Sequence, residues 1–161
     1  EVLVVRVHPE ILAKQKLPEG SVDTRIWDER LADIANFENY LTRQGTMILK
    51  FFLHVSRDEQ KKRFMERLDT PEKSWKFSLA DIQERDYWDD YMHAFEEAIQ
   101  ATAGELAPWY VVPADHKWFT RLVVAGAIGE ALDNLGLRYP QIDATKKKEL
   151  VRAREALARA T

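Results

Sequence analysis

The sequence predicts an α/β fold, in which helices cover a parallel sheet. Two apolar runs of strand length, residues 46–55 and 108–115, are each followed by helical sequence, and this alternation is typical of sheets with crossover connections. The first run is continuously apolar, as expected for a strand covered on both faces. Two strands are too few for such a sheet, so we expect further strands upstream of Glu1.

The amino-terminal segment permits two interpretations. The β-branched run at residues 2–7 has the propensity of a strand, but a helix is also compatible with it. After a loop around Gly20, Asp23 or Thr24 is expected to cap a helix that ends at Gly45. The predicted apolar face of this helix consists of Trp27, Leu31, Ile34, Phe37 and Leu41.

Capping signals predict where the next helices begin. Ser56 and Glu59 match a capping box, in which each side chain bonds the backbone amide of the other residue. Ser78 and Asp81 open a second, long helix that ends near Ala103. The predicted inward stripe of the long helix consists of Tyr87 or Trp88, Tyr91, Phe95 and Ile99.

The carboxy-terminal part is predicted to be helical. Asp115 is expected to cap a helix that Gly136 ends, and residues 144–161 form a polar helical tail with little apolar surface. The predicted domain organisation is therefore one domain portion at residues 1–143, followed by this tail.

Composition excludes several classes of protein. With 161 residues, 45% hydrophobic content and five tryptophans, the chain is expected to be globular and not disordered. A net charge of −3 gives no reason to expect a nucleic-acid partner. The longest apolar runs are too short to span a membrane. The absence of cysteine excludes disulfides and thiolate metal sites and fits a cytoplasmic location.

Common catalytic and metal motifs are missing from the sequence. No G-x-x-x-x-G-K-[ST] phosphate loop and no G-x-S-x-G nucleophile elbow occur,. The four histidines, at positions 8, 54, 93 and 116, lack metal-ligand spacing. We interpret His54, which lies in a predicted strand, as a core histidine with satisfied hydrogen bonds.

A basic stretch is the remaining chemical signal. Seven basic and five acidic residues lie between positions 57 and 76. Arg63 and Arg67 are four residues apart, hence on one helical face, and Lys73 and Lys76 lie just past the turn. Such a cluster can converge on a polyanion. The alternative is a solvated helix with ion pairs to Glu59, Glu66 and Asp69.

Two segments, residues 56–99 and 107–128, resemble the carboxy-terminal part of the polyphosphate kinase 2 family. The family patterns are R-F-x-x-R-x-x-x-P-x-K-x-W-K-x-S, a following aspartate, and P-W-x-x-x-x-A-D-x-K. The matching positions are Arg63, Phe64, Arg67, Pro71, Lys73, Trp75, Lys76, Ser78, Asp81, Pro108, Trp109, Ala114, Asp115 and Lys117.

The resemblance implies a P-loop kinase-like fold, a three-layer sandwich with a helical lid at about residues 57–100. It further implies transfer of a phosphoryl group between inorganic polyphosphate and a nucleoside mono- or diphosphate, with Mg²⁺. The Walker A and Walker B segments of such enzymes would lie upstream of Glu1. We therefore expect only the carboxy-terminal portion of the fold, no catalytic residues or metal ligands in this chain, and no activity of the chain alone. The first segment should then be a helix that follows the Walker B strand.

The resemblance also implies site residues and partners. Arg63, Arg67, Lys73 and Lys76 would close over polyphosphate, and Asp115 with Lys117 would lie on the nucleotide side. Because Lys117 follows a strand's carboxyl end, where open α/β sheets bind ligands, it is a candidate, although a structural role is equally compatible. The expected partners are polyphosphate, ADP/ATP or AMP, and further copies of the chain in a homo-oligomer.

Two other functions remain open at this point. One is an ATP-dependent nucleoside monophosphate kinase-type enzyme, which would use ATP as donor in place of polyphosphate. The other is a non-catalytic helical interaction module, in which the basic turn docks a protein.

Overall fold

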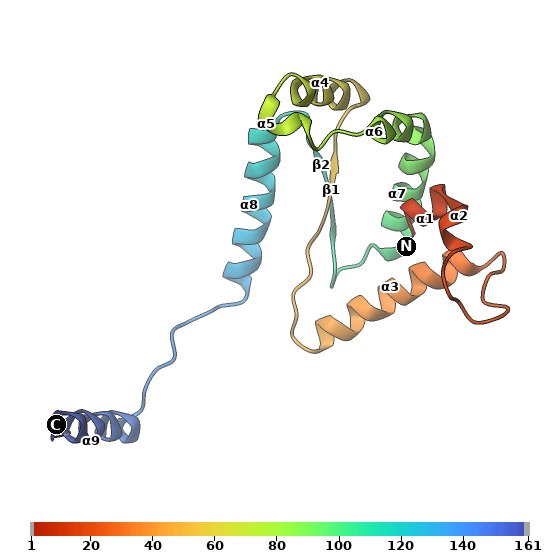
Figure 1. Cartoon of the computed structure of the whole chain (residues 1–161). Helices are drawn as coiled ribbons and strands as arrows, with labels where there is room; N and C mark the ends of the chain where they lie inside the picture. Colours follow the sequence, from red (N-terminus) through yellow and green to blue (C-terminus); the bar gives the residue numbers. More distant parts are fainter. Residues whose placement is uncertain (1, 160–161) are drawn as a thin grey trace. The chain divides into compact units, whose positions relative to one another are not determined.

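The computed structural model describes residues 2–159. The Walker segments and further strands are expected upstream of Glu1, outside the residues that the structure describes. This expectation therefore stays a prediction. The described residues form two compact units, one that runs up to Ile128 and one that starts at Gly129. The larger unit contains a small parallel sheet with helices around it (Figure 1). The α/β prediction is therefore confirmed at the level of a helix-rich fold with a parallel sheet.

Two strands form the sheet among the residues that the structure describes. Strands β1 (Lys50–His54) and β2 (Trp109–Pro113) are parallel, with Phe52 opposite Val111. Both lie within the predicted runs, but β1 is shorter than predicted, because residues 46–49 make no ladder with β2.

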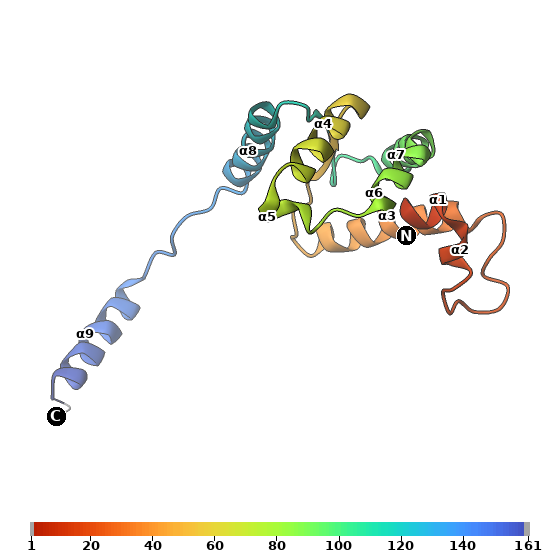
Figure 2. The same cartoon turned by 45° about the horizontal axis from the view of Figure 1, so that its top comes forward.

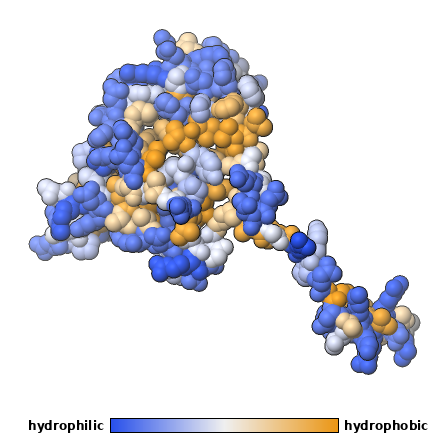
Figure 3. Space-filling view, turned by 180° about the vertical axis from the view of Figure 1, so that it is seen from behind, coloured by the Kyte–Doolittle hydropathy of each residue, from blue (hydrophilic) through white to orange (hydrophobic). Residues whose placement is uncertain are grey.

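The prediction that both faces of the strands are covered is wrong for the described residues. Val112 is 2% exposed, whereas Leu53 is 47% and Val111 57% exposed. Figure 3 shows a broad area of hydrophobic residues at the surface of the larger unit. The apolar run thus lacks the packing that its composition predicts.

The amino-terminal segment is helical, as the family resemblance implied. Helices α1 (Val4–Val7) and α2 (Pro9–Leu12) are one turn each, and Pro9 stands at the first position of α2. Val5 and Leu12 are buried in a cluster with Ile26. This burial outweighs the strand propensity of the β-branched run.

Helix α3 (Ile26–Arg43) carries the predicted inward face only in part. Leu31 is buried with Val2 and Ala98, but Phe37 is 61% exposed. The capping prediction is wrong, because Arg25 is the N-cap residue and its side chain makes no cap bond. Instead, the Asp23 carboxylate accepts a hydrogen bond from the Arg25 amide, in a turn that precedes the helix.

Five helical segments connect the two strands. They are α4 (Arg57–Leu68), α5 (Pro71–Ser74), α6 (Leu79–Gln83), the 3₁₀ helix η1 (Glu84–Tyr87) and α7 (Trp88–Thr102). The capping box of Ser78 and Asp81 is present. The single long helix that it was predicted to open is wrong, because η1 interrupts it.

Helix α7 packs against the amino-terminal helices. Figures 1 and 2 both show α1 beside α7. The predicted stripe of Tyr91, Phe95 and Ile99 is half-buried, and the fully buried positions are Ala94, Ala98 and Thr102, which small side chains occupy. Small residues allow neighbouring elements to approach α7 closely. The predicted stripe of large residues did not indicate this contact face.

The last two helices are α8 (Lys117–Asn134) and α9 (Ala144–Arg159). Gly136, with φ of +57°, follows α8 in the left-handed region that glycine favours,. Helix α9 buries none of its described side chains, in agreement with a polar helical tail. Within residues 2–159 no helix has the length and apolar composition required to cross a membrane.

Candidate functional site

A cavity of about 650 Å³ collects most of the predicted phosphate-binding residues. It is lined by Arg63, Glu66, Arg67, Asp69, Thr70, Lys73 and Lys117. Four of these side chains are basic and two are acidic. The lining comes from α4, from the turn into α5, from α5 itself and from the first residue of α8, so the fold joins residues that are more than 40 positions apart in the sequence.

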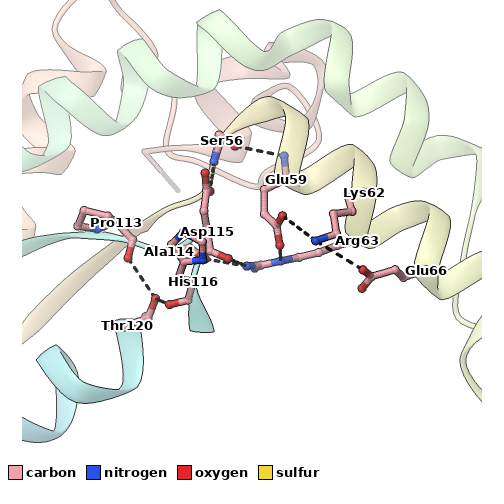
Figure 4. A network of polar contacts seen from close by, with 10 residues as sticks. All are labelled: Ser56, Glu59, Lys62, Arg63, Glu66, Pro113, Ala114, Asp115, His116 and Thr120. Carbon is pink, nitrogen blue, oxygen red and sulfur yellow. Dashed lines mark hydrogen bonds and ion pairs between the residues drawn. The ribbon is translucent and has the colours of Figure 1, made fainter. Parts of the chain in front are cut away.

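Arg63 holds helix α4 against the end of strand β2. Its Nε donates to Glu59 at 2.9 Å, and one Nη nitrogen donates to the carbonyl oxygens of Ala114 at 2.7 Å and Asp115 at 3.0 Å (Figure 4). Its side chain is 25% exposed. Arg63 is therefore partly committed to structure: its ion pair with Glu59 is one that the alternative of a solvated helix included, whereas its bonds to the Ala114 and Asp115 carbonyl oxygens were not predicted.

The prediction that Asp115 caps the helix that follows it is wrong, because its carboxylate binds the N-cap residue of α4. Its carboxylate accepts a hydrogen bond from the Ser56 amide at 2.7 Å, and the Ser56 hydroxyl accepts one from the Glu59 amide at 3.1 Å (Figure 4). Ser56 thus caps α4 as predicted. The reciprocal bond expected from Glu59 is replaced, because Asp115 takes the Ser56 amide and the Glu59 carboxylate binds Arg63.

This contact also stabilises the ionised form of Asp115. The hydrogen bond from the Ser56 amide, and then the Ser56 hydroxyl, lower the pKa of the Asp115 carboxyl below its ordinary value. The nearby charges of Arg63 and His116 act in the same direction, while desolvation opposes them. Asp115 therefore stays ionised and accepts hydrogen bonds near neutral pH.

The remaining cavity cations are available for a ligand. Arg67 lies with its guanidinium carbon 5.9 Å from the centre of the Phe64 ring. Among residues 2–159, neither Arg67 nor Lys73 nor Lys117 has a hydrogen-bond or ion-pair partner for its side chain. These three cations can neutralise an anion without first breaking an internal ion pair.

Lys76 lies outside this group. It does not line the cavity, and its Nζ sits 4.9 Å from the centre of the Trp75 ring, a side chain that is 75% exposed. The indole N–H of Trp75 donates to the Glu72 carbonyl oxygen within the turn. Phe77 contacts Phe64 edge to face at 5.4 Å and packs the turn against α4.

The cavity contains residues that the sequence reasoning did not single out as site residues. Glu66 lies on the face of α4 that carries Arg63 and Arg67, and Thr70 follows the C-cap residue Asp69 as the N-cap residue of α5. The Thr70 hydroxyl donates to the Glu66 carbonyl oxygen at 2.7 Å. Helical periodicity could have identified Glu66, because positions 63, 66 and 67 lie on one face, whereas Thr70 lies beyond the end of α4.

A smaller cavity of about 330 Å³ lies at the carboxyl ends of both strands. It is lined by His54, Ser56, Pro113, Asp115, His116 and Phe119. His54 is exposed, so its interpretation as a core histidine is wrong. Leu53 and His54, the last two residues of β1, are both exposed, because this end of the strand is not covered.

No dedicated metal site is formed by the described residues. No group of three or more His, Cys, Asp or Glu side chains that could hold a metal ion is present in residues 2–159. Glu66 and Asp69 bring two carboxylates to the larger cavity. Mg²⁺ usually needs phosphate oxygens or water in addition to such a pair.

Comparison with known proteins identifies relatives over most of the chain. The family model for polyphosphate kinase 2 (PPK2) matches residues 16–138. An ADP-polyphosphate phosphotransferase of Rhodopseudomonas palustris is 49% identical over 158 residues, which are 98% of this chain and 55% of the relative. An AMP/ADP-polyphosphate phosphotransferase of Meiothermus ruber is 43% identical over 151 residues, 94% of this chain and 52% of the relative.

A solved structure is similar as well. A polyphosphate kinase 2 from Arthrobacter aurescens TC1 matches with a TM-score of 0.78 and 44% sequence identity, over 94% of this chain and 50% of the other. The chain therefore spans about half the length of these three relatives.

Proposed function

Because the chain belongs to the polyphosphate kinase 2 family, we propose that it serves a phosphotransferase that moves a phosphoryl group between inorganic polyphosphate and a nucleoside mono- or diphosphate. The names of the relatives from Rhodopseudomonas palustris and Meiothermus ruber support this proposal. A P-loop kinase-like sandwich with a helical lid is the proposed fold of the whole enzyme, and cytoplasm is its proposed location.

The observation that carries the proposal is the convergence of four cations on one cavity. Arg63, Arg67, Lys73 and Lys117 line it together. Polyphosphate presents closely spaced phosphate oxygens, which guanidinium groups bind in pairs and lysines bind as mobile point charges. The two acidic neighbours leave an excess of two positive charges. We assign polyphosphate to this cavity.

Phosphoryl transfer requires positioning and charge neutralisation more than covalent help from the protein. In the proposed arrangement Arg67 and Lys73 bind polyphosphate oxygens from the proposed lid, about residues 57–100. We call its first part, residues 57–87, the lid segment. Lys117 binds from the carboxyl end of β2. Arg63 holds α4 in place through the Ala114 and Asp115 carbonyl oxygens and offers its remaining N–H groups to the anion.

Mg²⁺ and the Walker segments are proposed from the family alone. When bound, the ion would neutralise charge on the phosphoryl group that is transferred. The described residues do not fit a dedicated site for it, so we assign no metal ligand in this chain and derive no step through the ion. The Walker segments, with the catalytic residues, are proposed to lie upstream of Glu1, and no catalytic residue is assigned here. Nucleotide binding near Asp115 and Lys117 likewise stays a proposal.

Binding of polyphosphate tests the proposal directly. We expect the chain to bind medium-length polyphosphate with an affinity that falls steeply as salt increases. Arg67→Ala should weaken binding by about tenfold, because one charge-assisted hydrogen bond contributes at least about 1.5 kcal/mol. Glu105→Ala, which removes an exposed charge far from the cavity, should leave the affinity unchanged. Calorimetric titration provides the measurement.

The alternatives predict different results in the same titration. Stronger binding of ATP than of polyphosphate, with the same loss in Arg67→Ala, would favour a nucleoside monophosphate kinase-type enzyme. If neither anion binds, the polyphosphate assignment is contradicted, and the non-catalytic helical interaction module is the remaining alternative.

A further inference from the structure

The 3₁₀ helix η1 is fixed to elements on two sides. It stands between α6 and α7, at the point where the predicted long helix is broken. A 3₁₀ turn within a helical stretch often marks a functional hinge or local strain. The contacts of Glu84 and Arg85 show which elements hold this turn.

Arg85 connects η1 to the first turn of α4. Its Nη1 donates to the Gln60 Oε1 atom at 2.7 Å, and its Nη2 donates to the Arg57 carbonyl oxygen at 3.2 Å. In return, the Nη2 of Arg57 donates to the Arg85 carbonyl oxygen at 3.3 Å. Two arginines 28 residues apart therefore exchange side-chain to backbone hydrogen bonds. We define Arg57, Gln60 and Arg85 as the arginine clasp.

Glu84 connects the same turn to the body of the larger unit. Its Oε2 atom accepts hydrogen bonds from the His8 Nε2 at 3.0 Å and from the Tyr91 hydroxyl at 2.9 Å. The neighbouring Tyr87 ring packs edge to face on the His8 ring at 4.7 Å. Residues Glu84 and Arg85 thus hold η1 between α4 on one side and the α1–α2 junction and α7 on the other.

The clasp closes the lid segment into a loop with fixed ends. Closing a loop of this length has an entropic cost that grows with the number of residues, and a bond between its ends restricts the positions that the residues between them can reach. Lys73 lies within this loop and lines the cation cavity. The clasp therefore limits how far Lys73 can move from Arg63 and Arg67.

We propose that Arg85 is a positioning residue, which fixes the returning end of the lid segment on α4 and so holds Lys73 at the cation cavity. The proposal rests on the proposed function in so far as the cavity binds polyphosphate. The clasp itself rests on the contacts of Arg57, Gln60 and Arg85 alone. Arginine suits this role because its planar guanidinium reaches the side-chain oxygen of Gln60 and the backbone oxygen of Arg57 at once, which a single ammonium group does less well.

The test compares Arg85→Lys, the double variant Arg85→Lys with Gln60→Glu, and the control Arg43→Lys in the 161-residue chain. Arg85→Lys should weaken polyphosphate binding by about tenfold, the effect of losing about one charge-assisted hydrogen bond. The double variant should recover most of that loss, because the new carboxylate gives the lysine a charged partner. Arg43 is exposed near the end of α3, and its variant should bind like the parent chain.

Amide hydrogen exchange provides a second readout that needs no ligand. In Arg85→Lys, exchange should accelerate in residues 69–83 and stay unchanged in α3, and the double variant should reverse it. Unchanged exchange and unchanged affinity in Arg85→Lys would overturn the proposal. A loss that the double variant does not reverse, accompanied by faster exchange throughout the unit, would show that Arg85 is only structural. If the parent chain binds no polyphosphate, the proposed function fails, and the exchange result alone decides on the clasp.

Discussion

At the scale of single residues, two arginines that look equivalent in the sequence have different environments. Arg63 and Arg67 are four positions apart on one face of α4. Arg63 donates to Glu59 and to two backbone carbonyl oxygens, whereas Arg67 only approaches the Phe64 ring. Substitution of Arg63 should therefore affect folding as well as anion binding, while Arg67 reports on binding alone.

His8 is the residue for which we expect a pH-dependent contribution to stability. The hydrogen bond with Glu84 is the main cause of the raised pKa of His8, and the charge of Glu10 adds to it. The same hydrogen bond lowers the pKa of Glu84, and the hydrogen bond from Tyr91 lowers it further. Because the folded-state pKa of His8 lies above its ordinary value of 6.5, its contribution is complete below that value and is lost as the pH rises through the raised pKa. For Glu84, the contribution is complete above 4.5 and is lost on acidification.

Thermal unfolding measures this contribution. Between about pH 6 and pH 8.5, the melting temperature of the parent chain should fall more than that of His8→Gln, because the parent chain loses the His8–Glu84 contribution in this range,. His93→Gln is the matched control, because the His93 side chain is exposed and lies 3.5 Å from Glu97 on the same helix. Equal pH profiles for the parent chain and His8→Gln would contradict the prediction.

At the scale of elements, the start of α4 is determined by contacts with the end of β2. The Ser56 hydroxyl caps the helix, and the Asp115 carboxylate binds the Ser56 amide from a segment 59 residues away. Arg63 adds a second connection, from the second turn of α4 to the Ala114 and Asp115 carbonyl oxygens. These contacts fix the direction in which α4 leaves the sheet and hence the position of the cation cavity.

We expect this cap to contribute measurably to stability. Ser56→Ala should lower the free energy of unfolding by about 1 kcal/mol, the usual effect of losing a serine N-cap. Asp115→Ala should also destabilise the chain, whereas Asp115→Asn should do so less, because the amide oxygen can still accept from the Ser56 amide. Urea unfolding gives the comparison, with Ser21→Ala in a loop as control. A Ser56→Ala variant as stable as the Ser21→Ala control would show that the cap is not significant.

At the scale of the whole molecule, a large apolar surface remains exposed. Leu53 and Val111 on the two strands are about half exposed, and among residues 2–159 each strand has a hydrogen-bonded neighbour on one side only. Exposed apolar patches and unpaired strand edges favour association. A homo-oligomer is therefore still expected for this chain.

Light scattering after size exclusion tests this expectation. The 161-residue chain should associate at micromolar concentration and bind a hydrophobic dye. The double variant Leu53→Lys and Val111→Lys should reduce both effects, because it places charges on the exposed strands. Leu157→Lys, which places one such charge on the polar helix α9, should alter neither. A monomeric parent chain that binds no dye would rule out association through this surface.

The sequence by itself determined the local features of this protein. The capping residues Ser56 and Ser78, the left-handed turn at Gly136 and the cationic face of Arg63 and Arg67 depend on contacts within a few residues. Such features can be predicted from the sequence because the interacting groups are neighbours in the chain. The parallel pairing of two apolar runs was also predictable, since a helical connection between strands favours that direction.

Only the tertiary structure decided which distant groups meet. Lys117 joins Arg67 at one cavity, Asp115 binds Ser56 in place of its own helix, and Arg85 exchanges bonds with Arg57. The burial of Val5 made residues 4–7 helical against their propensity. In each case the stabilising free energy comes from packing or hydrogen bonds between segments far apart in the sequence. A local sequence pattern therefore cannot predict these contacts.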